Sequence, residues 1–439
     1  MSQTVTSLSY WVKQGFTGPI KIMMRKYCLH DANLSRSWTC CQVDVFNGGL
    51  SIMTEISRRS ALGAAAATAG GLLAATAIRD DTQAAVGTET SSEAHDDELP
   101  SFRFALGEQK PIVYSGGHFR EASVLEFPAA ENIAGVLVNL APGGIRELHW
   151  HANATEWAYV ISGRCQVTVA DPAGHCEIVD FAAGDVWYFP RGHGHAIQAF
   201  GSDECQFIEV FENGHFSGFA TFSSTDWFAH TPPEVLAKNF GVPASVFAEF
   251  PKREVFIGKG PAPEPLPSDP PFGSQNSGPL THRYRLEAQQ PQTFAGGSVR
   301  LASMKEFPLS TNMTGATMRI KPGGLREMHW HPNADEWQYY LAGRVRMTVF
   351  GAKGRSRTFD FGPGDVGYVP LGYGHYIENV GEQDAEVVLV FNSGTYQDIS
   401  ASGWLAGNPP ELLGANFSVS PSVFAQFPKQ SVFITTGKG

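Results

Sequence analysis

The chain has little positive charge, few cysteines and no long, strongly apolar run. Its 32 lysines and arginines stand against 43 aspartates and glutamates, which gives a formal net charge of −11 and a pI near 5.7. This balance argues against nucleic acid or an anionic membrane surface as a partner. A mildly apolar stretch at residues 61–77 is too short and too rich in Ala and Gly to anchor stably in a membrane.

The cysteines do not repeat along the chain. Three of the six lie in the first 52 residues, and the other three are Cys165, Cys176 and Cys205. Cys165 and Cys176 flank a turn symmetrically, so a cross-strand disulfide between them is conceivable. The corresponding positions 180 residues later are Val345 and Ser356, and the strained geometry of such a bridge is uncommon. We therefore favour free, buried thiols over a disulfide.

The N-terminal region contains a targeting pattern. Within residues 53–86, the pair Arg58-Arg59 precedes an alanine-rich stretch that ends in a small-residue triplet. This order resembles a twin-arginine secretion signal, which serves as an address and is removed; an ordinary amphipathic or transmembrane helix is the alternative. We expect an exported protein, periplasmic or extracellular, whose natural start is Met53. Residues 1–52 show no periodic pattern, and we expect an extension that precedes the natural start and is disordered if translated.

What the chain does contain is one pattern twice, 180 residues apart. PGGIRELHWHANATEWAYVISG and GDVWYFPRGHGHAIQ recur as PGGLREMHWHPNADEWQYYLAG and GDVGYVPLGYGHYIE. The ligand-type residues of the two copies are His149, His151, Glu156 and His195, then His329, His331, Glu336 and His375. Four such residues repeating in register make isolated structural histidines an inadequate explanation. Three neutral imidazoles and one carboxylate suit a borderline divalent ion such as manganese, iron, zinc or copper.

The spacing of these residues predicts how they converge. The two histidines of HWH are two apart, and the period of a strand places both on one face. Glu156 follows His151 by five residues, after a short polar run typical of a turn or bulge, and the last histidine belongs to a later strand. Pairs of strands that converge on one interior point are what a small closed barrel provides. The sequence therefore predicts an all-β fold with one metal site in each copy.

Both copies match the two cupin signature motifs. The first motif covers Gly143 to Gly163 and Gly323 to Gly343. The second includes Gly184, Pro190, Gly192 and His195 in the first copy, and Gly364, Pro370, Gly372 and His375 in the second. The asparagine that closes the second motif is Asn379 in the second copy but Ala199 in the first. Two such domains, each with RE(L/M)HWH, resemble the bicupin oxalate decarboxylases over roughly residues 98–430. The resemblance implies two tandem cupin (double-stranded β-helix, or jelly-roll) barrels, two manganese ions per chain, dioxygen as cofactor, oxalate as the dicarboxylate substrate and a homo-oligomeric assembly.

The domain boundaries follow from the repeat and from composition. We expect an extension at 1–52, a signal at 53–86, a first cupin domain at 98–257, a linker at 258–279 and a second cupin domain at 280–436. The linker is rich in Pro, Gly and Ser. Each barrel precedes a short helical segment, for which Thr231 and Asn408 are predicted N-caps and Gly241 ends a helix.

The repeat changes length in one place only. Its offset falls from 180 to 177 between Phe211 and Trp227, so the first copy has three extra residues after its last metal-bearing strand. A loop lengthened in one copy is a candidate lid, and neutral loop drift is the alternative. In the family this loop carries a Ser-Glu-Asn-Ser-Thr stretch whose glutamate is assigned as the proton donor. The matching residues here are Ser217, Gly218, Phe219, Ala220 and Thr221, so the lid glutamate is missing.

Glu209 is a possible substitute for the missing acid. It lies on an apolar strand 14 residues after His195, where the second copy has Leu389. In the family a glutamate on this strand belongs to the second barrel. A carboxyl beside a metal should have a perturbed pKa, as a proton donor requires; the alternative is that Glu209 faces outward. His215, at the start of the lid, is a further candidate for proton transfer.

Arg146 and Arg326 each precede the first histidine of their copy by three residues. By resemblance each contacts the bound dicarboxylate, a role that suits the planar guanidinium group. A surface salt bridge with the adjacent Glu147 or Glu327 is the alternative.

The leading hypothesis is a secreted, manganese-dependent bicupin that cleaves oxalate to formate and carbon dioxide. One rival hypothesis is an oxalate oxidase that gives carbon dioxide and hydrogen peroxide, and another is a non-catalytic, storage-type bicupin.

Overall fold

The computed structural model describes residues 99–216, 221–264 and 281–436, together with the backbone of four strands within residues 6–56. The chain divides into two compact units between Glu93 and Ala94. The first unit contains an antiparallel sheet in chain order, formed by β1 (Thr6–Val12), β2 (Ile20–Leu29), β3 (Trp38–Asn47) and β4 (Leu50–Ile56). These segments are rich in β-branched and aromatic residues, which favour strands, so the expectation of no regular structure within 1–52 differs from the backbone found. The remainder of the predicted signal, residues 57–86, lies outside the described residues, and a start at Met53 stays a prediction.

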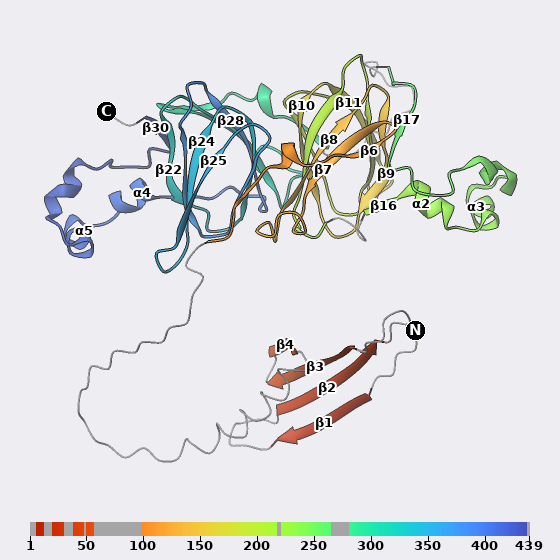
Figure 1. The fold of residues 1–439 in the computed structure, drawn as a ribbon, viewed down its shortest axis with the longest axis horizontal. Helices are drawn as coiled ribbons and strands as arrows, with labels where there is room; N and C mark the ends of the chain where they lie inside the picture. Colours follow the sequence, from red (N-terminus) through yellow and green to blue (C-terminus); the bar gives the residue numbers. More distant parts are fainter. Residues whose placement is uncertain are drawn as a thin grey trace. The chain divides into compact units, whose positions relative to one another are not determined.

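The second unit consists of two β-domains, each built from a seven-stranded and a six-stranded antiparallel sheet (Figure 1). The first domain contains β6 (Ile112–Tyr114), β7 (Gly117–Ala122), β8 (Ala134–Leu140), β9 (Gly144–His151), β10 (Glu156–Ser162), β11 (Arg164–Ala170), β12 (Cys176–Ala182), β13 (Asp185–Phe189), β14 (Gly194–Ala199), β15 (Cys205–Phe211), β16 (Thr221–Ser223) and β17 (Ile257–Lys259). The second contains β19 (Gln292–Phe294), β20 (Gly297–Ala302), β21 (Thr314–Ile320), β22 (Gly324–Trp330), β23 (Glu336–Ala342), β24 (Val345–Phe350), β25 (Ser356–Phe361), β26 (Val366–Val369), β27 (Gly374–Asn379), β28 (Ala385–Phe391), β29 (Ile399–Ser400) and β30 (Ile434–Thr436). The predicted jelly-roll fold is confirmed, with the refinement that each domain is a pair of facing sheets and not a closed barrel.

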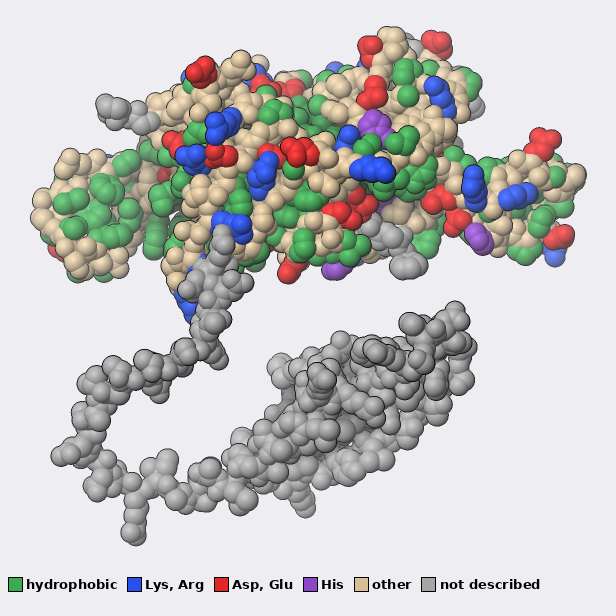
Figure 2. All heavy atoms as spheres, in the orientation of Figure 1, with side chains coloured by type: hydrophobic (Ala, Val, Ile, Leu, Met, Phe, Trp, Pro, Cys, Tyr) green, Lys and Arg blue, Asp and Glu red, His purple; other side chains and the backbone are tan. Residues whose placement is uncertain are grey.

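A helical tail projects from each domain (Figure 1). The tails contain α2 (Ser224–Ala229), α3 (Pro233–Phe240) and η2 (Ala244–Glu249), then α4 (Ala401–Ala406), α5 (Pro410–Phe417) and η4 (Pro421–Gln426); the short helices η1 (Leu106–Glu108) and η3 (Leu286–Ala288) lie elsewhere. Gly241 ends α3 in the left-handed conformation, as predicted. Thr231 and Asn408 do not cap the helices, because their side chains donate back to carbonyls of the preceding helix and leave Pro232 and Pro409 at the N-cap. Apolar side chains gather over the tail that contains α4 and α5 (Figure 2).

The two domains exchange short strands. β18 (Arg283–Arg285), at the start of the second half, pairs with β13 of the first domain, and β5 (Arg103–Phe104) pairs with β26 of the second. Arg103 Nη2 lies 2.7 Å from Asp365 Oδ1 across this junction. The predicted boundaries at 98–257 and 280–436 therefore differ from the folded domains by one strand each. The first residues of the predicted linker, Gly258 and Lys259, also belong to a strand, β17.

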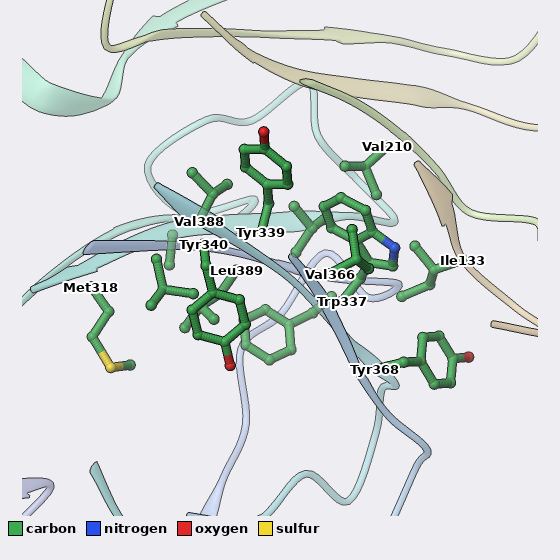
Figure 3. Packing of buried hydrophobic residues seen from close by; sticks show 14 of the residues in the cluster. Ile133, Val210, Met318, Trp337, Tyr339, Tyr340, Val366, Tyr368, Val388 and Leu389 are labelled. Atoms are coloured by element: carbon green, nitrogen blue, oxygen red, sulfur yellow. The ribbon is translucent and has the colours of Figure 1, made fainter. Parts of the chain in front are cut away.

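The interface between the domains is a shared hydrophobic core. Alternate residues of β8 point to different places: Leu137 joins the core shared by both domains, whereas Val136 and Val138 join the interior of the first domain. A Cβ atom on Gly135 would lie 2.2 Å from Trp337 Cζ2, so only glycine fits beneath that ring. Figure 3 shows Val210 of the first domain near the same indole. The two domains thus form one packed body. No helix among the described residues has the length and apolar character needed to cross a membrane.

Candidate metal centres and the first-site cavity

The predicted ligands of each copy converge in the interior of their domain. β9 presents His149 and His151 on one face, β14 pairs His195 opposite His149, and β10 begins at Glu156. In each set of four, one ligand atom per residue can be chosen so that all lie within 4.8 Å of one another. The eight side chains are buried, none more than 5 % exposed. Within the described residues, these are the only two groups of three or more His, Cys, Asp or Glu side chains close enough to hold one ion.

Hydrogen bonds orient the imidazoles. His149 Nδ1 lies 2.6 Å from the carbonyl oxygen of Glu147, and His195 Nδ1 lies 2.9 Å from that of His193. His151 Nδ1 lies 3.0 Å from Thr221 Oγ1. Because a carbonyl can only accept, Nδ1 of His149 and His195 carries the proton and Nε2 is free to bind a cation. Thr221, the last residue of the predicted lid, therefore contributes to the site by supporting a ligand.

The protonation states also suit a divalent cation. Burial lowers the pKa of His149 well below its ordinary value and the pKa of His151 to about 4, so both rings are neutral. Burial acts to raise the pKa of Glu156, but His195 and His151 outweigh it and hold that pKa below its usual range. Glu156 Oε2 lies 3.1 Å from Nε2 of both His151 and His195, where a cation would separate these groups. Three imidazoles and one ionised carboxylate fit manganese and its neighbours.

The second centre has the same ligands but a different support for its carboxylate. His331 Nε2 and His375 Nε2 lie 2.8 and 3.0 Å from Glu336 Oε2. In the first centre, Trp187 Nε1 donates to Glu156 Oε1 at 2.7 Å. In the second, Gln338 Nε2 donates to the equivalent oxygen of Glu336 at 2.8 Å. Groups that hydrogen-bond to a metal ligand alter the affinity and reactivity of the bound metal, so the two centres are not chemically identical.

A cavity of about 360 Å³ adjoins the first centre. Its lining includes the metal ligand His151, the candidate residues Arg146, Glu209 and Thr221, and Phe216. Phe216 is buried and stacks on Phe211 with ring centroids 3.9 Å apart. Sequence reasoning missed Phe216, although it directly follows His215 in the lengthened loop.

Arg146 is buried in this cavity wall and does not form the alternative surface salt bridge. The carboxylate of Glu147 accepts instead from the backbone N of Phe256 at 2.6 Å and from Thr225 Oγ1 at 2.6 Å. Within the described part of the chain, Arg146 makes no ion pair; burial lowers its pKa, and nearby carboxylates, Glu209 foremost, partly offset this effect. Its guanidinium group is therefore available to an anion that enters the cavity.

Phe256 holds Arg146 in place. The guanidinium carbon lies 3.8 Å from the centroid of the Phe256 ring, and Arg146 Nη1 donates to the Phe256 carbonyl at 3.3 Å. Phe256 has a φ of 61°, a left-handed conformation that a phenylalanine rarely adopts and that stores strain. Phe433 repeats this arrangement under Arg326, with a φ of 56° and a distance of 3.9 Å. The Arg-Glu pair before HWH thus contacts the chain where it returns to the domain. In the first copy, Arg146 contacts the ring and the carbonyl oxygen of Phe256, and Glu147 accepts from its backbone N.

Glu209 points into the cavity, against the alternative that it faces outward. It is 6 % exposed, and its Oε1 atom is buried without a hydrogen-bond partner among the described residues. Burial raises the pKa of Glu209 well above its ordinary value, the charge of Glu156 raises it further, and Arg146 opposes both. A buried carboxyl of this kind can hold a proton near neutral pH.

His215, the other candidate for proton transfer, is not part of the cavity wall. His215 is exposed, and its backbone is held by Asn213 and Asn153. The lid residues Ser217, Gly218, Phe219 and Ala220 lie outside the described residues. The role of the lid stays a prediction.

The second centre differs from the first because its arginine is occupied. Arg326 is fully buried, donates to Asp398 Oδ2 and donates to the Tyr396 hydroxyl at 3.1 Å. Burial acts to lower the pKa of Arg326, but Tyr396 and Asp398 raise it overall. Sequence reasoning missed this ion pair, because Asp398 lies in the segment where the repeat loses its register. Arg326 is therefore less available to a substrate than Arg146.

The three cysteines within residues 99–436 that the structure describes are free. Cys165 and Cys205 are buried, as favoured from the sequence, whereas Cys176 is exposed. The prediction of a buried thiol is wrong for Cys176, because it begins β12 at the edge of its sheet.

Known proteins resemble the chain over both domains. Residues 104–246 and 284–424 each match the cupin family. The chain is 42% identical over 321 residues to oxalate decarboxylase OxdC of Bacillus subtilis, covering 73% of this chain and 83% of that protein. It is 33% identical over 360 residues to an oxalate decarboxylase of Arthroderma benhamiae, covering 76% and 84%. The Bacillus subtilis oxalate decarboxylase structure at pH 4.6 matches with a TM-score of 0.73 and 38% identity, covering 82% of this chain and 97% of that one. A structure concerned with the Mn(II) centres of that enzyme gives a TM-score of 0.73, 37% identity and coverage of 82% and 99%.

Proposed function

The chain belongs to the bicupin oxalate decarboxylase family of the cupin superfamily, and from this premise we propose that it is a manganese-dependent carbon-carbon lyase that cleaves oxalate to formate and carbon dioxide at its first centre. The observation that carries the assignment to one centre is the state of the two arginines. Arg146 lies in a cavity beside its centre without an ion-pair partner in the described residues, whereas Arg326 is paired with Asp398. The second centre then serves mainly to stabilise the fold.

The residues around the first centre have separate tasks. Manganese held by His149, His151, Glu156 and His195 would supply, with dioxygen as redox partner, the electron transfer that activates oxalate. Arg146 binds a carboxylate of the substrate through its guanidinium group and stabilises charge as it redistributes. Glu209 supplies the proton that converts the retained carboxylate fragment to formate. Phe211 and Phe216 line the cavity with apolar surface and limit the access of water.

The experiment that tests the proposal is a product assay on the manganese-loaded protein. Oxalate should yield formate and carbon dioxide in equal amounts, with little hydrogen peroxide. Peroxide in place of formate would support the oxidase hypothesis, which the missing lid glutamate favours, and neither product would leave the storage-type hypothesis. Introducing a lid acid by Gly218→Glu discriminates further: the ratio of formate to peroxide should scarcely change if Glu209 already supplies the proton, and should rise if the protein is mainly an oxidase.

Phe256→Ala should raise the KM for oxalate by about 2- to 30-fold and change kcat less, because a cation–π contact is worth about 0.5–2 kcal/mol. The substitution removes the ring that supports Arg146 and leaves both the arginine and the metal ligands in place. Steady-state kinetics at matched manganese content measure the effect. Phe433→Ala is the matched control, since it removes the equivalent ring under Arg326; an equal rise in KM from both variants would contradict the assignment to the first centre.

We also propose that the chain forms a homo-oligomer through its helical tails. Trp227, Phe240, Trp404, Leu412 and Phe417 are each at least half exposed or nearly so, and Figure 2 shows the apolar surface of one tail. Contiguous exposed apolar surface of this kind marks association sites. Light scattering after size-exclusion chromatography should give a mass above that of one chain, and Trp404→Glu should lower it.

Export by the twin-arginine pattern is likewise a proposal, which a cell-fractionation experiment on Arg58→Lys/Arg59→Lys tests.

A further inference from the structure

A pair of histidines lies at the junction of the two domains, outside both metal centres. His193 is in the loop between β13 and β14, and His282 immediately precedes the exchanged strand β18. Their ring centroids are 5.9 Å apart. Each ring has one buried nitrogen without a hydrogen-bond partner, Nδ1 of His193 and Nε2 of His282. Among the described residues, one other imidazole nitrogen is buried without a hydrogen-bond partner: Nε2 of His151, a ligand of the first centre.

Glu177 determines which nitrogen of His282 is free. Its Oε2 atom lies 2.7 Å from His282 Nδ1 and also accepts from the His282 backbone N at 2.8 Å. A carboxylate accepts, so Nδ1 carries a proton, and in the neutral ring Nε2 keeps its lone pair. His282 is only 8 % exposed, and a buried acceptor without a donor is destabilising. A carboxylate that orients a histidine through its other nitrogen is the usual support of a metal ligand.

The second half of the chain shows that the fold does not need two imidazoles at this place. The positions 180 residues from His193 and His282 are Tyr373 and Phe102, whose rings pack with centroids 6.1 Å apart. The position equivalent to Glu177 is Arg357. An aromatic pair therefore fills the same junction where the first half has two imidazoles and a supporting carboxylate. The two imidazoles therefore point to a ligand that an aromatic pair cannot bind.

We propose that His193 and His282 form a third metal site, for a late first-row divalent ion of the zinc class, with solvent completing the coordination. Imidazole nitrogen suits such ions, and the partial exposure of His193 leaves solvent access. An ion held here joins a loop of the first domain to the chain that enters the second. This site does not depend on the proposed chemistry of oxalate. A bridging water molecule is the competing occupant.

Crystals of the manganese-loaded protein, soaked in Zn²⁺ and measured at the zinc absorption edge, should show an anomalous peak between His193 and His282. In solution, the protein should bind one more Zn²⁺ per chain than the variant His193→Tyr/His282→Phe, which installs the aromatic pair of the second half. This variant keeps the carbonyl of residue 193 that orients His195, as the Tyr373 carbonyl does for His375. Manganese released from the two centres is followed by its EPR signal, so exchange there is not mistaken for the third site.

Glu177→Gln provides a second measurement that leaves both histidines in place. It should weaken zinc binding at the junction by about 10- to 100-fold, the usual effect of losing a group that supports a metal ligand, without changing manganese content. Density at the junction without anomalous signal would mean water only and would overturn the proposal. Equal zinc binding by the native protein, the double variant and Glu177→Gln would overturn it as well.

Discussion

Glu156→Gln should lower the rate of formate production by at least about 100-fold, because it removes the anionic ligand of the first centre and a bound metal contributes several kcal/mol to such chemistry. Glutamine keeps the volume of the side chain and an oxygen that can accept from Trp187 Nε1, so the surrounding structure should persist. The effect is measured as kcat, with the manganese content of each preparation determined in parallel. The loss should be larger at this centre than at the second, because the cavity that contains Arg146 adjoins the first centre.

Glu336→Gln is the matched control, because Gln338 plays the supporting part that Trp187 plays in the first centre. This variant should bind less manganese and unfold at a lower temperature, while the rate per occupied first centre changes little. Equal losses of turnover from the two variants at equal metal loading would reject the assignment of catalysis to the first centre. A larger loss from Glu336→Gln would move the reaction to the second.

The metal ligands could be predicted from the sequence because local geometry determines them. Two histidines two residues apart on one strand share a face whatever the rest of the fold does, and the repeat identified Glu156 and His195 as their partners. The jelly roll followed from the same spacing together with the family motifs. What the sequence predicted less well was how pairs of strands close around the site, since facing sheets and a closed barrel produce the same alternation along a strand.

The features that the sequence did not reveal depend on residues far apart in the chain. Phe256 lies 110 residues from Arg146, and no local pattern indicates that its ring and carbonyl hold the guanidinium group. Asp398 falls where the two copies lose their register, so comparing the copies did not pair it with Arg326. The strand exchange between β18 and β13 is likewise a tertiary property, because three residues are too few to show a strand pattern. The sequence showed that the two copies differ in loop length and at Glu209, but the different states of Arg146 and Arg326 became visible only in the structure.

Glu209→Gln should reduce formate production by about 100- to 10,000-fold, the usual contribution of general acid catalysis, with a much smaller effect on the KM for oxalate. Glu209 lies in the cavity with Arg146, and its Oε1 atom has no partner among the described residues, so a proton on it can pass to the substrate. Glutamine preserves the volume but cannot donate an acidic proton. Glu209→Leu is the natural control for packing, because Leu389 occupies the equivalent place in the second domain. Both variants should lose formate alike while retaining oxalate binding.

The pH dependence gives an independent measure of the same group. Burial and the charge of Glu156 raise the pKa of Glu209 above its ordinary value of 4.5, so the acid stays protonated to a higher pH than a free carboxyl. Formate production should fall as pH rises through that pKa, and this limb of the profile should be missing from the residual activity of Glu209→Gln. In the metal-free protein, the folded state retains a proton that the unfolded state releases above pH 4.5, so the free energy of unfolding should decrease as pH rises until Glu209 itself ionises. If the native protein and Glu209→Gln show the same pH–rate limb, Glu209 is not the proton donor and the role passes to the lid or to water.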